Sequence, residues 1–268
     1  MSSKINWLLK NTTPGSIVLQ SWLTKHGISP QLAAKYNGSD WLHKLANGVY
    51  IRSGKKTGWH EAVSALSKQL SLPVALAGIS SLAYQGKSHY LQLNNDSVWV
   101  SVSNKSKLPS WFKEFYQLDE RYLNSDEPPW KLITHKNINS LKENDFITLD
   151  VNGVEMSSSG QELAVYEMLE QVPKAYSFEY AAELMQGLVN LSPRKVQSLL
   201  ERSSSVRTNR LYLFLGHYYQ HPWIERIQEE NIQLGSGNRQ IVVGGKLDKK
   251  YHITVPKSFA LNEENHYG

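Results

Sequence analysis

The fold of the N-terminal part is decided by residues Ser16 to Arg52, which read SIVLQSWLTKHGISPQLAAKYNGSDWLHKLANGVYIR. In the first half of this stretch, apolar residues recur at the i, i+1, i+4, i+5 spacing of one helical face. These residues are Val18, Leu19, Trp22 and Leu23. Gly27 follows His26 as a helix stop, so we expect a first helix that ends there and a short turn after it.

A second helix is predicted from Pro30, because Ser29 and Pro30 are residue types favoured at the N-cap and in the first turn. Three of its residues are expected to face inward: Leu32, Ala33 and Tyr36. Three lie together on the opposite face: Gln31, Ala34 and Lys35. Glutamine pairs with adenine, alanine packs on the thymine methyl group, and lysine reaches guanine or phosphate. This outer face therefore suits the reading of bases in a major groove.

The stretch ends in a predicted β-hairpin. Its strands run from Trp41 to Ala46 and from Val49 to Arg52, around Asn47-Gly48, a pair suited to a two-residue turn with positive φ at both positions. Helix, turn, helix and hairpin together predict a winged helix-turn-helix, a fold that binds duplex DNA. Basic residues in and after the hairpin are expected to lie along phosphates. The candidate DNA-binding residues are Ser29, Gln31, Ala34, Lys35, Lys44, Tyr50, Arg52, Lys55 and Lys56.

Any small helical bundle with a hairpin has the same pattern, so charge provides a second criterion. Residues 1–60 hold eight lysines and arginines and one acidic residue, Asp40, which gives +7, whereas the remainder carries −2. The whole positive excess of the chain, whose formal net charge is +5, therefore falls on the segment with the DNA-binding pattern. An ordinary solvated face is the alternative explanation of such an excess.

Length and composition indicate a globular protein. With 268 residues, 40% of them hydrophobic, we expect two domains, residues 1–95 and 96–268. The absence of cysteine excludes disulfides, thiolate nucleophiles and zinc-thiolate sites, and it is compatible with the cytoplasm. The start, MSSKINWLLKNTT, has too short an apolar run for a signal peptide, and no segment approaches the roughly 20 apolar residues of a membrane span. We therefore expect a cytoplasmic protein without membrane contact.

The remaining patterns predict an α+β fold: a winged helix-turn-helix domain, then a mixed α/β domain with four helices and short antiparallel strands. In the first domain they add helices over 4–10, 58–70 and 78–85 and a hairpin of strands 90–93 and 98–102. In the second they predict a strand at 132–133 and a hairpin around Asn152-Gly153. Helices follow from Ser159, which with Glu162 forms a capping box, and from Ser177, Ser192 and Val206. The last helix, to Tyr219, is expected to be the most buried. Strands are predicted over 232–234, 240–243 and 252–255.

Two other function classes compete with DNA binding. His217, His221 and Glu225 have a spacing that places metal ligands on one helix face, but Pro222 is expected to end that helix between them. Gly235-Ser236-Gly237 faintly resembles a phosphate-binding loop and lacks its lysine and helix, so a tight turn is the favoured interpretation. An effector pocket is the second alternative, lined by Tyr176, Tyr212, Tyr218 and Trp223; aromatic residues at helical spacing usually form a core.

Two blocks of sequence resemble a known family. The first runs from Trp41 to Leu93 and includes WLHKLANGVYIR, HEAVSALSKQL, LPVALAGISSLAYQG and HYLQL. The second includes NLSPRKVQSLLE, SVRTNRLYLFLGH, Trp223 and IQLGSGNRQIVVGGKLDKKYHITVP. Together they resemble the AbiEi antitoxins of type IV toxin-antitoxin systems, bacterial regulators associated with abortive phage infection. The resemblance covers nearly the whole chain.

The resemblance implies an antitoxin and transcriptional repressor, with no enzymatic activity and no metal or cofactor. Residues 1–95 would bind inverted repeats in double-stranded promoter DNA of its own operon. Residues 96–268 would counteract an AbiEii-like toxin, which is similar to nucleotidyltransferases, without requiring a stable complex. The candidate antitoxicity residues are Arg194, Lys195, Arg202, Arg207, Arg210, Arg239, Lys246, Lys249 and Lys250. Ordinary solvated charge is the alternative for each of them. A regulator whose C-terminal domain senses a small molecule remains the alternative function.

Overall fold

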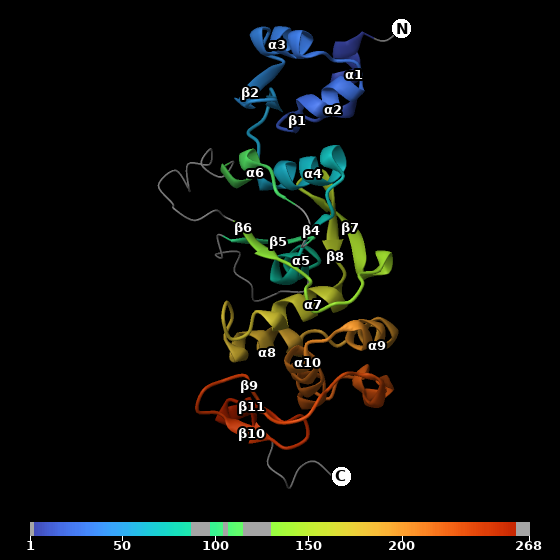
Figure 1. Cartoon of the computed structure of the whole chain (residues 1–268), viewed down its shortest axis with the longest axis vertical. Coiled ribbons are helices and arrows are strands. Elements are labelled where there is room, and N and C mark those ends of the chain that lie inside the picture. Colours follow the sequence, from blue (N-terminus) through green and yellow to red (C-terminus); the bar gives the residue numbers. More distant parts are fainter. Residues whose placement is uncertain (1–2, 87–96, 104–106, 115–129, 261–268) are drawn as a thin grey trace. The chain divides into compact units, whose positions relative to one another are not determined.

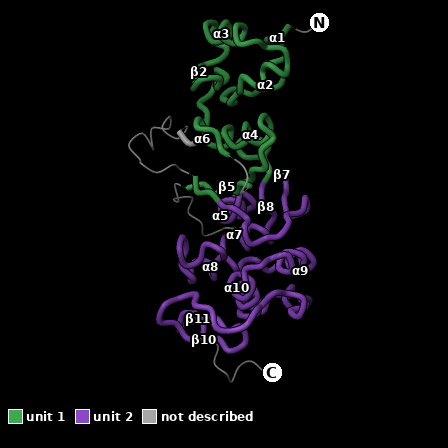
Figure 2. The backbone as a smooth tube through the Cα atoms, viewed as in Figure 1, with its two compact units in different colours: residues 1–75, 96–132, 148–157 green, residues 76–95, 133–147, 158–268 purple. Residues whose placement is uncertain are grey.

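The computed structural model describes residues 3–86, 97–103, 107–114 and 130–260 (Figure 1). The chain divides into two compact units, each assembled from separate stretches of sequence (Figure 2). Unit 1 comprises residues 1–75, 96–132 and 148–157, and unit 2 comprises residues 76–95, 133–147 and 158–268. Because the units interleave along the chain, no single cut separates them, and a boundary after residue 95 stays a prediction.

Unit 1 begins with a winged helix-turn-helix. Its elements are α1 (Lys4–Asn11), β1 (Ile17–Leu19), α2 (Gln20–Lys25), α3 (Pro30–Gly38), β2 (Leu42–Ala46) and β3 (Val49–Arg52). The strands form an antiparallel sheet in the order β1-β3-β2. Helices α2 and α3 are the helix-turn-helix, and the β2–β3 hairpin is the wing. The fold expected from residues 16–52 is therefore confirmed.

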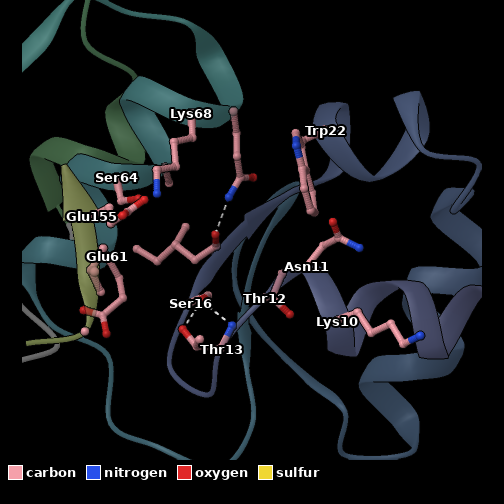
Figure 3. A pocket seen from close by; sticks show the side chains of 15 residues that line it. Lys10, Asn11, Thr12, Thr13, Ser16, Trp22, Glu61, Ser64, Lys68 and Glu155 are labelled. Carbon is pink, nitrogen blue, oxygen red and sulfur yellow. Dashed lines mark hydrogen bonds between the residues drawn. The ribbon is translucent and has the colours of Figure 1, made fainter. Parts of the chain in front are cut away.

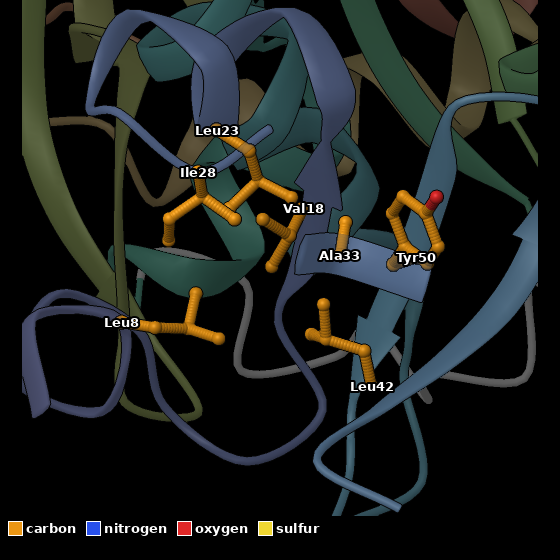
Figure 4. Close-up of a cluster of buried hydrophobic side chains, with 7 residues drawn as sticks. All are labelled: Leu8, Val18, Leu23, Ile28, Ala33, Leu42 and Tyr50. Carbon is orange, nitrogen blue, oxygen red and sulfur yellow. The ribbon is translucent and has the colours of Figure 1, made fainter. Parts of the chain in front are cut away.

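One hydrophobic core joins all six of these elements (Figure 4). Burial of a leucine, isoleucine or valine side chain stabilises the fold by roughly 1.5–3 kcal/mol relative to leaving it exposed. Trp7, Trp22, Leu32 and Tyr36 pack against the core from its partly exposed rim. The buried members are Leu8, Val18, Leu23, Ile28, Ala33, Leu42 and Tyr50.

The prediction that Val18 and Leu19 open the first helix is wrong. They belong to β1, where Val18 pairs with Tyr50 and Leu19 with Val49, and α2 begins one residue later at Gln20. All three residues of β1 are buried. A buried strand of three residues has no alternation that a sequence pattern can detect, so its apolar residues merge with the periodicity of the helix that follows.

The two Asn-Gly turns differ from each other. At the turn between β7 (Phe146–Val151) and β8 (Val154–Ser159), both Asn152 (φ 55°) and Gly153 (φ 83°) are left-handed, as predicted. At the β2–β3 turn only Gly48 is left-handed (φ 70°), so the prediction of positive φ at both positions is wrong for Asn47. The pairing of β2 with β3 also shifts between Lys44 and Ala46, which leaves Leu45 as an extra residue. A bulge of this kind increases the local right-handed twist of the hairpin. The two strands can then be joined by a turn that does not have positive φ at both central residues.

A five-stranded sheet follows in the order β6-β5-β4-β8-β7. Its strands are β4 (Val74–Leu76), β5 (Val98–Val102), β6 (Trp130–Ile133), β7 (Phe146–Val151) and β8 (Val154–Ser159). In unit 1, α4 (Trp59–Leu70) confirms the predicted amphipathic helix, and α6 (Ser110–Glu114) buries Trp111 and Phe112. The predicted strand 90–93 lies outside the described residues.

Unit 2 is built around two buried helices. Its helices are α5 (Gly78–Tyr84), α7 (Gln161–Glu170), α8 (Phe178–Gln186), α9 (Pro193–Arg202) and α10 (Val206–Tyr218). Helix α10 is buried from Thr208 to Gly216, as predicted, and α7 is equally buried from Glu162 to Leu169. A small sheet in the order β10-β11-β9 contains β9 (Arg239–Gln240), β10 (Lys246–Asp248) and β11 (Ile253–Val255). Short 3-10 helices are η3 (Glu143–Asp145), η4 (Ile224–Arg226), η5 (Glu229–Asn231) and η6 (Lys257–Phe259).

Three local predictions in unit 2 are wrong. Gly160, and not Ser159, is the N-cap of α7, and the expected capping box does not form. Ser159 ends β8 and donates to Glu167, while Glu162 accepts from the amide of Ser192, so tertiary partners replace the local ones. Residues 232–234 form no strand, and only residue 240 of the expected strand 240–243 is in a strand.

Candidate nucleic-acid interface

The outer face of α3 is a flat, exposed row. The Ser29 hydroxyl accepts from the Leu32 amide at 3.2 Å and so caps the helix as predicted. Two turns of the helix then present exposed residues at i, i+3, i+4 and i+7. Two of the four are small, and a Cβ built at Gly38 meets no atom within 4 Å. Backbone and side chains of this row can therefore approach a flat partner closely. The row consists of Gln31, Ala34, Lys35 and Gly38.

Lys44 is held next to the end of this helix. Its backbone amide donates to Asn37 Oδ1 at 2.8 Å, which ties the outer strand β2 to the last turn of α3. The Lys44 side chain is exposed, as are those of Lys55 and Lys56 in the segment after β3. Strand β2 is an edge strand of the three-stranded sheet, and Asn37 already binds the Lys44 amide on it.

Arg52 does not lie on the exposed edge as predicted. Its Nη1 donates to the carbonyl of Thr12 at 2.5 Å and caps the C-terminal end of α1, and the residue is only partly exposed. Successive side chains of a strand alternate between its faces, so Arg52 shares with Tyr50 the face that the helices cover. Its charge serves the fold of the winged helix.

Tyr50 is not a surface residue either. It is 8% exposed and packs in the winged-helix core beside Val18, its cross-strand partner. The residue that pattern analysis missed on the same hairpin is His43, which is exposed on β2. Trp41, 45% exposed at the start of β2, was also missed. Both could have been found from the sequence, because Trp41 and His43 alternate with the inward-facing Leu42 along the strand.

Gln69 of α4 closes the other edge of the winged-helix sheet. Its side-chain amide accepts from the Leu19 amide at 2.8 Å and donates to the Ile17 carbonyl at 2.6 Å, so it occupies the place of a neighbouring strand. A cavity of about 420 Å³ lies beside Gln69 within unit 1 (Figure 3). Its walls include Lys10, Trp22 and Lys68. The cavity lies far in sequence from the tyrosines considered for an effector pocket.

Those aromatic residues of the C-terminal region pack against each other. Tyr212 and Trp223 are buried with ring centroids 5.8 Å apart, and Tyr176 is 7% exposed. Tyr218 stacks on Phe214. They form part of the core of unit 2, so the structure does not support an effector pocket at these positions.

The proposed metal ligands are separated. Helix α10 ends at Tyr218, as expected from Pro222. His217 binds Glu229, whereas buried His221 faces the carbonyl of Met185 at 2.8 Å. Among residues 3–86, 97–103, 107–114 and 130–260, no three histidine, aspartate or glutamate side chains form a group that fits a metal ion.

Three of the predicted antitoxicity residues are structural. Arg202 forms a bidentate ion pair with Asp145, with N–O distances of 2.8 and 2.9 Å. Arg207 donates to the carbonyl of Val172. Arg210 is 2% exposed and donates to four backbone carbonyls, those of Leu234, Gly235, Gly237 and His252. Backbone and carboxylate oxygens inside unit 2 therefore bind the guanidinium groups of these three residues, and their role in antitoxicity stays a prediction.

The glycine loop 235–237 is the counterpart of Arg210. Gly235 and Gly237 have φ of 57° and 72°, and both point their carbonyls at the guanidinium. A phosphate-binding loop presents amides, so this loop has the opposite polarity. Residues 235–237 form a turn whose carbonyls bind the Arg210 guanidinium, which agrees with the tight turn predicted from the sequence.

The remaining basic candidates stay accessible. Arg239 is partly exposed and donates to the neighbouring Asn238 carbonyl. Lys195 is also partly exposed, on α9. Four others are exposed: Arg194, Lys246, Lys249 and Lys250.

Glu229 collects three partners near β10 and β11. Its Oε1 accepts from His217 at 3.0 Å and from the Tyr251 hydroxyl at 2.8 Å, and Lys250 Nζ lies 3.4 Å away. The hydrogen bond from His217, followed by those of Tyr251 and the charge of Lys250, lowers the pKa of Glu229 to about 2. This carboxylate therefore stabilises unit 2 in its ionised form.

Glu229→Gln is expected to lower the free energy of unfolding at pH 7 by roughly 1–2 kcal/mol, less than full linkage because the side chain is 29% exposed. The pKa of Glu229 is lower in the folded than in the unfolded chain. Its contribution is therefore complete above about pH 4.5 and is lost as the pH falls toward 2. Urea unfolding between pH 7 and 2.5 measures this, with exposed Glu230→Gln as the control. A difference between variant and wild type that does not shrink with acidification would contradict it.

No described helix is both long and apolar enough to cross a membrane. This finding covers the parts of the chain that the structure describes.

The comparisons with known proteins agree across both parts of the chain. Residues 1–93 match the family model described as "Transcriptional regulator, AbiEi antitoxin N-terminal domain". Residues 95–256 match "Transcriptional regulator, AbiEi antitoxin, Type IV TA system". No curated protein matches. The crystal structure of the RV2827C protein from Mycobacterium tuberculosis is similar in fold, with a TM-score of 0.60 and 12% identity over 93% of this chain and 88% of that chain. The chain therefore belongs to the AbiEi family of antitoxins and transcriptional regulators of type IV toxin-antitoxin systems.

Proposed function

We propose that the winged helix binds inverted repeats in the promoter of its own operon and represses transcription. The observation that supports this most directly is the exposed row on α3, in which Gln31 and Lys35 flank small residues on a capped helix. Recognition helices of this fold family place such a row in the major groove. The net charge of +7 in residues 1–60 favours the approach of a polyanion.

Variants of the α3 row and variants of the wing are expected to affect DNA binding in different ways. Gln31→Ala should change base preference at one or two positions by about 5- to 100-fold, because it removes a base contact. Lys44→Ala should weaken binding to every duplex to a similar extent, whatever its sequence, because it removes a phosphate contact. It should also reduce the slope of log affinity against log salt by about 1. Fluorescence anisotropy on promoter duplexes at several salt concentrations measures both. Lys68→Ala, an exposed lysine of α4, is the control.

If Gln31→Ala leaves the preference unchanged, α3 does not read bases. Salt-independent binding by the wild-type chain would exclude the phosphate contacts. With Lys35, Lys44, Lys55 and Lys56 each neutralising one phosphate, the slope of log affinity against log salt should be about −4 per bound chain.

The second part of the proposal is that unit 2 counteracts a nucleotidyltransferase-like toxin encoded beside it. Family membership supports the antitoxin role, and the accessible basic residues provide candidate positions. Because unit 1 includes residues 148–157, truncation after residue 108 removes part of both units, so substitutions in the full chain are the cleaner test.

Combined replacement of Arg194, Lys246 and Lys249 by alanine is expected to reduce rescue of growth when the chain is co-expressed with the neighbouring toxin. These side chains are exposed, so the fold should persist. Lys174→Ala, also exposed in unit 2, is the matched control. Full rescue by the triple variant, with an unchanged circular dichroism spectrum, would exclude this surface from antitoxicity.

A further inference from the structure

The tip of the wing is short and is bound to the body of the domain. Because Ala46 pairs with Val49, only Asn47 and Gly48 form the loop. The carbonyl of Gly48 accepts from the backbone amide of Gln20 at 2.8 Å. Strand β1 pairs with β3 up to Leu19 and Val49, so the hairpin ends level with its neighbour and does not project beyond it.

Gln20 holds this tip from the start of α2. A Cβ built at Gly48 would lie 3.6 Å from the Gln20 Cβ, which places the loop in van der Waals contact with the helix. The Gln20 side chain is itself fixed by donation to Thr24 Oγ1 at 3.1 Å and to the Ile28 carbonyl at 3.2 Å. The tip therefore packs on the helix-turn-helix and is not a free arm.

The tip carries neither a cation nor an apolar wedge, the groups that minor-groove proteins commonly insert. Its exposed side chain is Asn47, a residue type that can also read the minor groove, and the preceding Ala46 is half-buried. The short reach of the loop, which is bound to Gln20, is therefore what argues against entry into the minor groove. The nearest cation along the strand, Lys44, is tied through its backbone to Asn37 at the end of α3. The basic charge of the wing is thus placed beside the recognition helix.

We propose that the operator is read from the major groove alone. Helix α3 contacts base edges, the β2 edge with Lys44 lies on the adjacent phosphates, and the hairpin tip stays on α2 and leaves the minor groove empty. The chemistry of the row predicts the class of half-site: Gln31 pairs with an adenine, and Ala34 packs on a thymine methyl group, so each half-site contains A·T pairs at its centre. This inference rests on the proposed function, namely operator binding.

Modified promoter duplexes test the inference with the wild-type full chain. Replacing thymine by uracil removes the major-groove methyl group, and replacing adenine by 7-deazaadenine removes N7. We expect one of these substitutions within a half-site to raise Kd by about 5- to 100-fold. Replacing guanine by inosine removes only the minor-groove amino group, and it should change Kd by less than 2-fold. Saturating netropsin, which occupies the minor groove of A·T pairs, should not displace the protein.

A pair of protein variants provides the second readout. Asn47→Ala at the tip should leave Kd within 2-fold, whereas Lys44→Ala, three residues earlier, should raise it. A greater than 10-fold effect of inosine, netropsin or Asn47→Ala would overturn the inference while leaving operator binding intact. Failure of the wild-type chain to bind any promoter duplex at low salt would instead refute the proposed function, and the inference with it.

Discussion

Arg210→Ala is expected to lower the free energy of unfolding by about 3–5 kcal/mol. The guanidinium is 2% exposed and donates to four carbonyls, at 2.6–3.2 Å. Hydrogen bonds to a charged group contribute about 1.5–3 kcal/mol each, and a carbonyl left buried without a donor costs about 1–3 kcal/mol. Some of the loop carbonyls regain water in the variant, which places the total below the sum of the four.

Urea unfolding followed by circular dichroism measures this effect. Arg239→Ala is the matched control, because Arg239 is more exposed and its positive charge repels that of Arg210. It should change the free energy of unfolding by less than about 0.5 kcal/mol. A cost below about 1 kcal/mol for Arg210→Ala would show that the loop 235–237 does not depend on this cation. Because Arg210→Ala is expected to destabilise unit 2, loss of growth rescue by this variant would not identify a toxin contact.

Glu167→Ala is also expected to lower the free energy of unfolding by about 3–5 kcal/mol. The Glu167 side chain is fully buried, and its Oε1 lies 2.6 Å from His135 Nε2 and 2.9 Å from the Ser159 hydroxyl. Its Oε2 accepts from the amide of Gly78 at 2.7 Å. One carboxylate therefore joins α7 to the start of α5, the end of β8 and the segment after β6, all within unit 2.

A double-mutant cycle separates the contact between His135 and Glu167 from the rest of this network. Glu167→Ala, His135→Ala and the double variant should show a coupling free energy of about 1–3 kcal/mol, since each single replacement removes the same contact between two buried side chains. Glu183→Gln, an exposed carboxylate of α8, should stay within about 0.5 kcal/mol of wild type. Additive effects of the two single variants would contradict the direct pairing of His135 with Glu167.

Local signals predicted where most of the helices lie, but not every helix start. The N-caps Ser29 and Ser177 were predicted from residue type and are observed, each accepting from an amide three residues later. Ser159 with Glu162 has an equally good local pattern, yet Ser159 donates to Glu167 inside the helix and Glu162 accepts from Ser192, which is 30 residues away. A capping residue is predictable when its hydroxyl has no stronger acceptor within reach, and only the tertiary structure shows whether one exists.

Charge patterns were less informative about the site. Lys35 and Lys44 are exposed where the sequence predicted, but Arg52 and Arg210 bind backbone carbonyls. The planar guanidinium offers five donors in a fixed geometry, which makes arginine the basic residue most readily used inside a protein. Four of the arginines predicted to face a partner therefore bind oxygens of the protein itself, and the roles of the predicted basic residues stay proposals.

The sequence by itself determined the helix-turn-helix with its hairpin and the separate buried helices of unit 2, because helix periodicity, caps and turns depend on neighbours along the chain. The family followed from the resemblance of two long sequence blocks. Only the tertiary structure decided that Val18 lies in a strand, that Tyr50 and Arg210 point inward, and that the wing tip is bound to Gln20. Each of these depends on a partner more than 20 residues away. Contacts over such distances are selected by packing and by the satisfaction of buried polar groups, which leave no local pattern in the sequence.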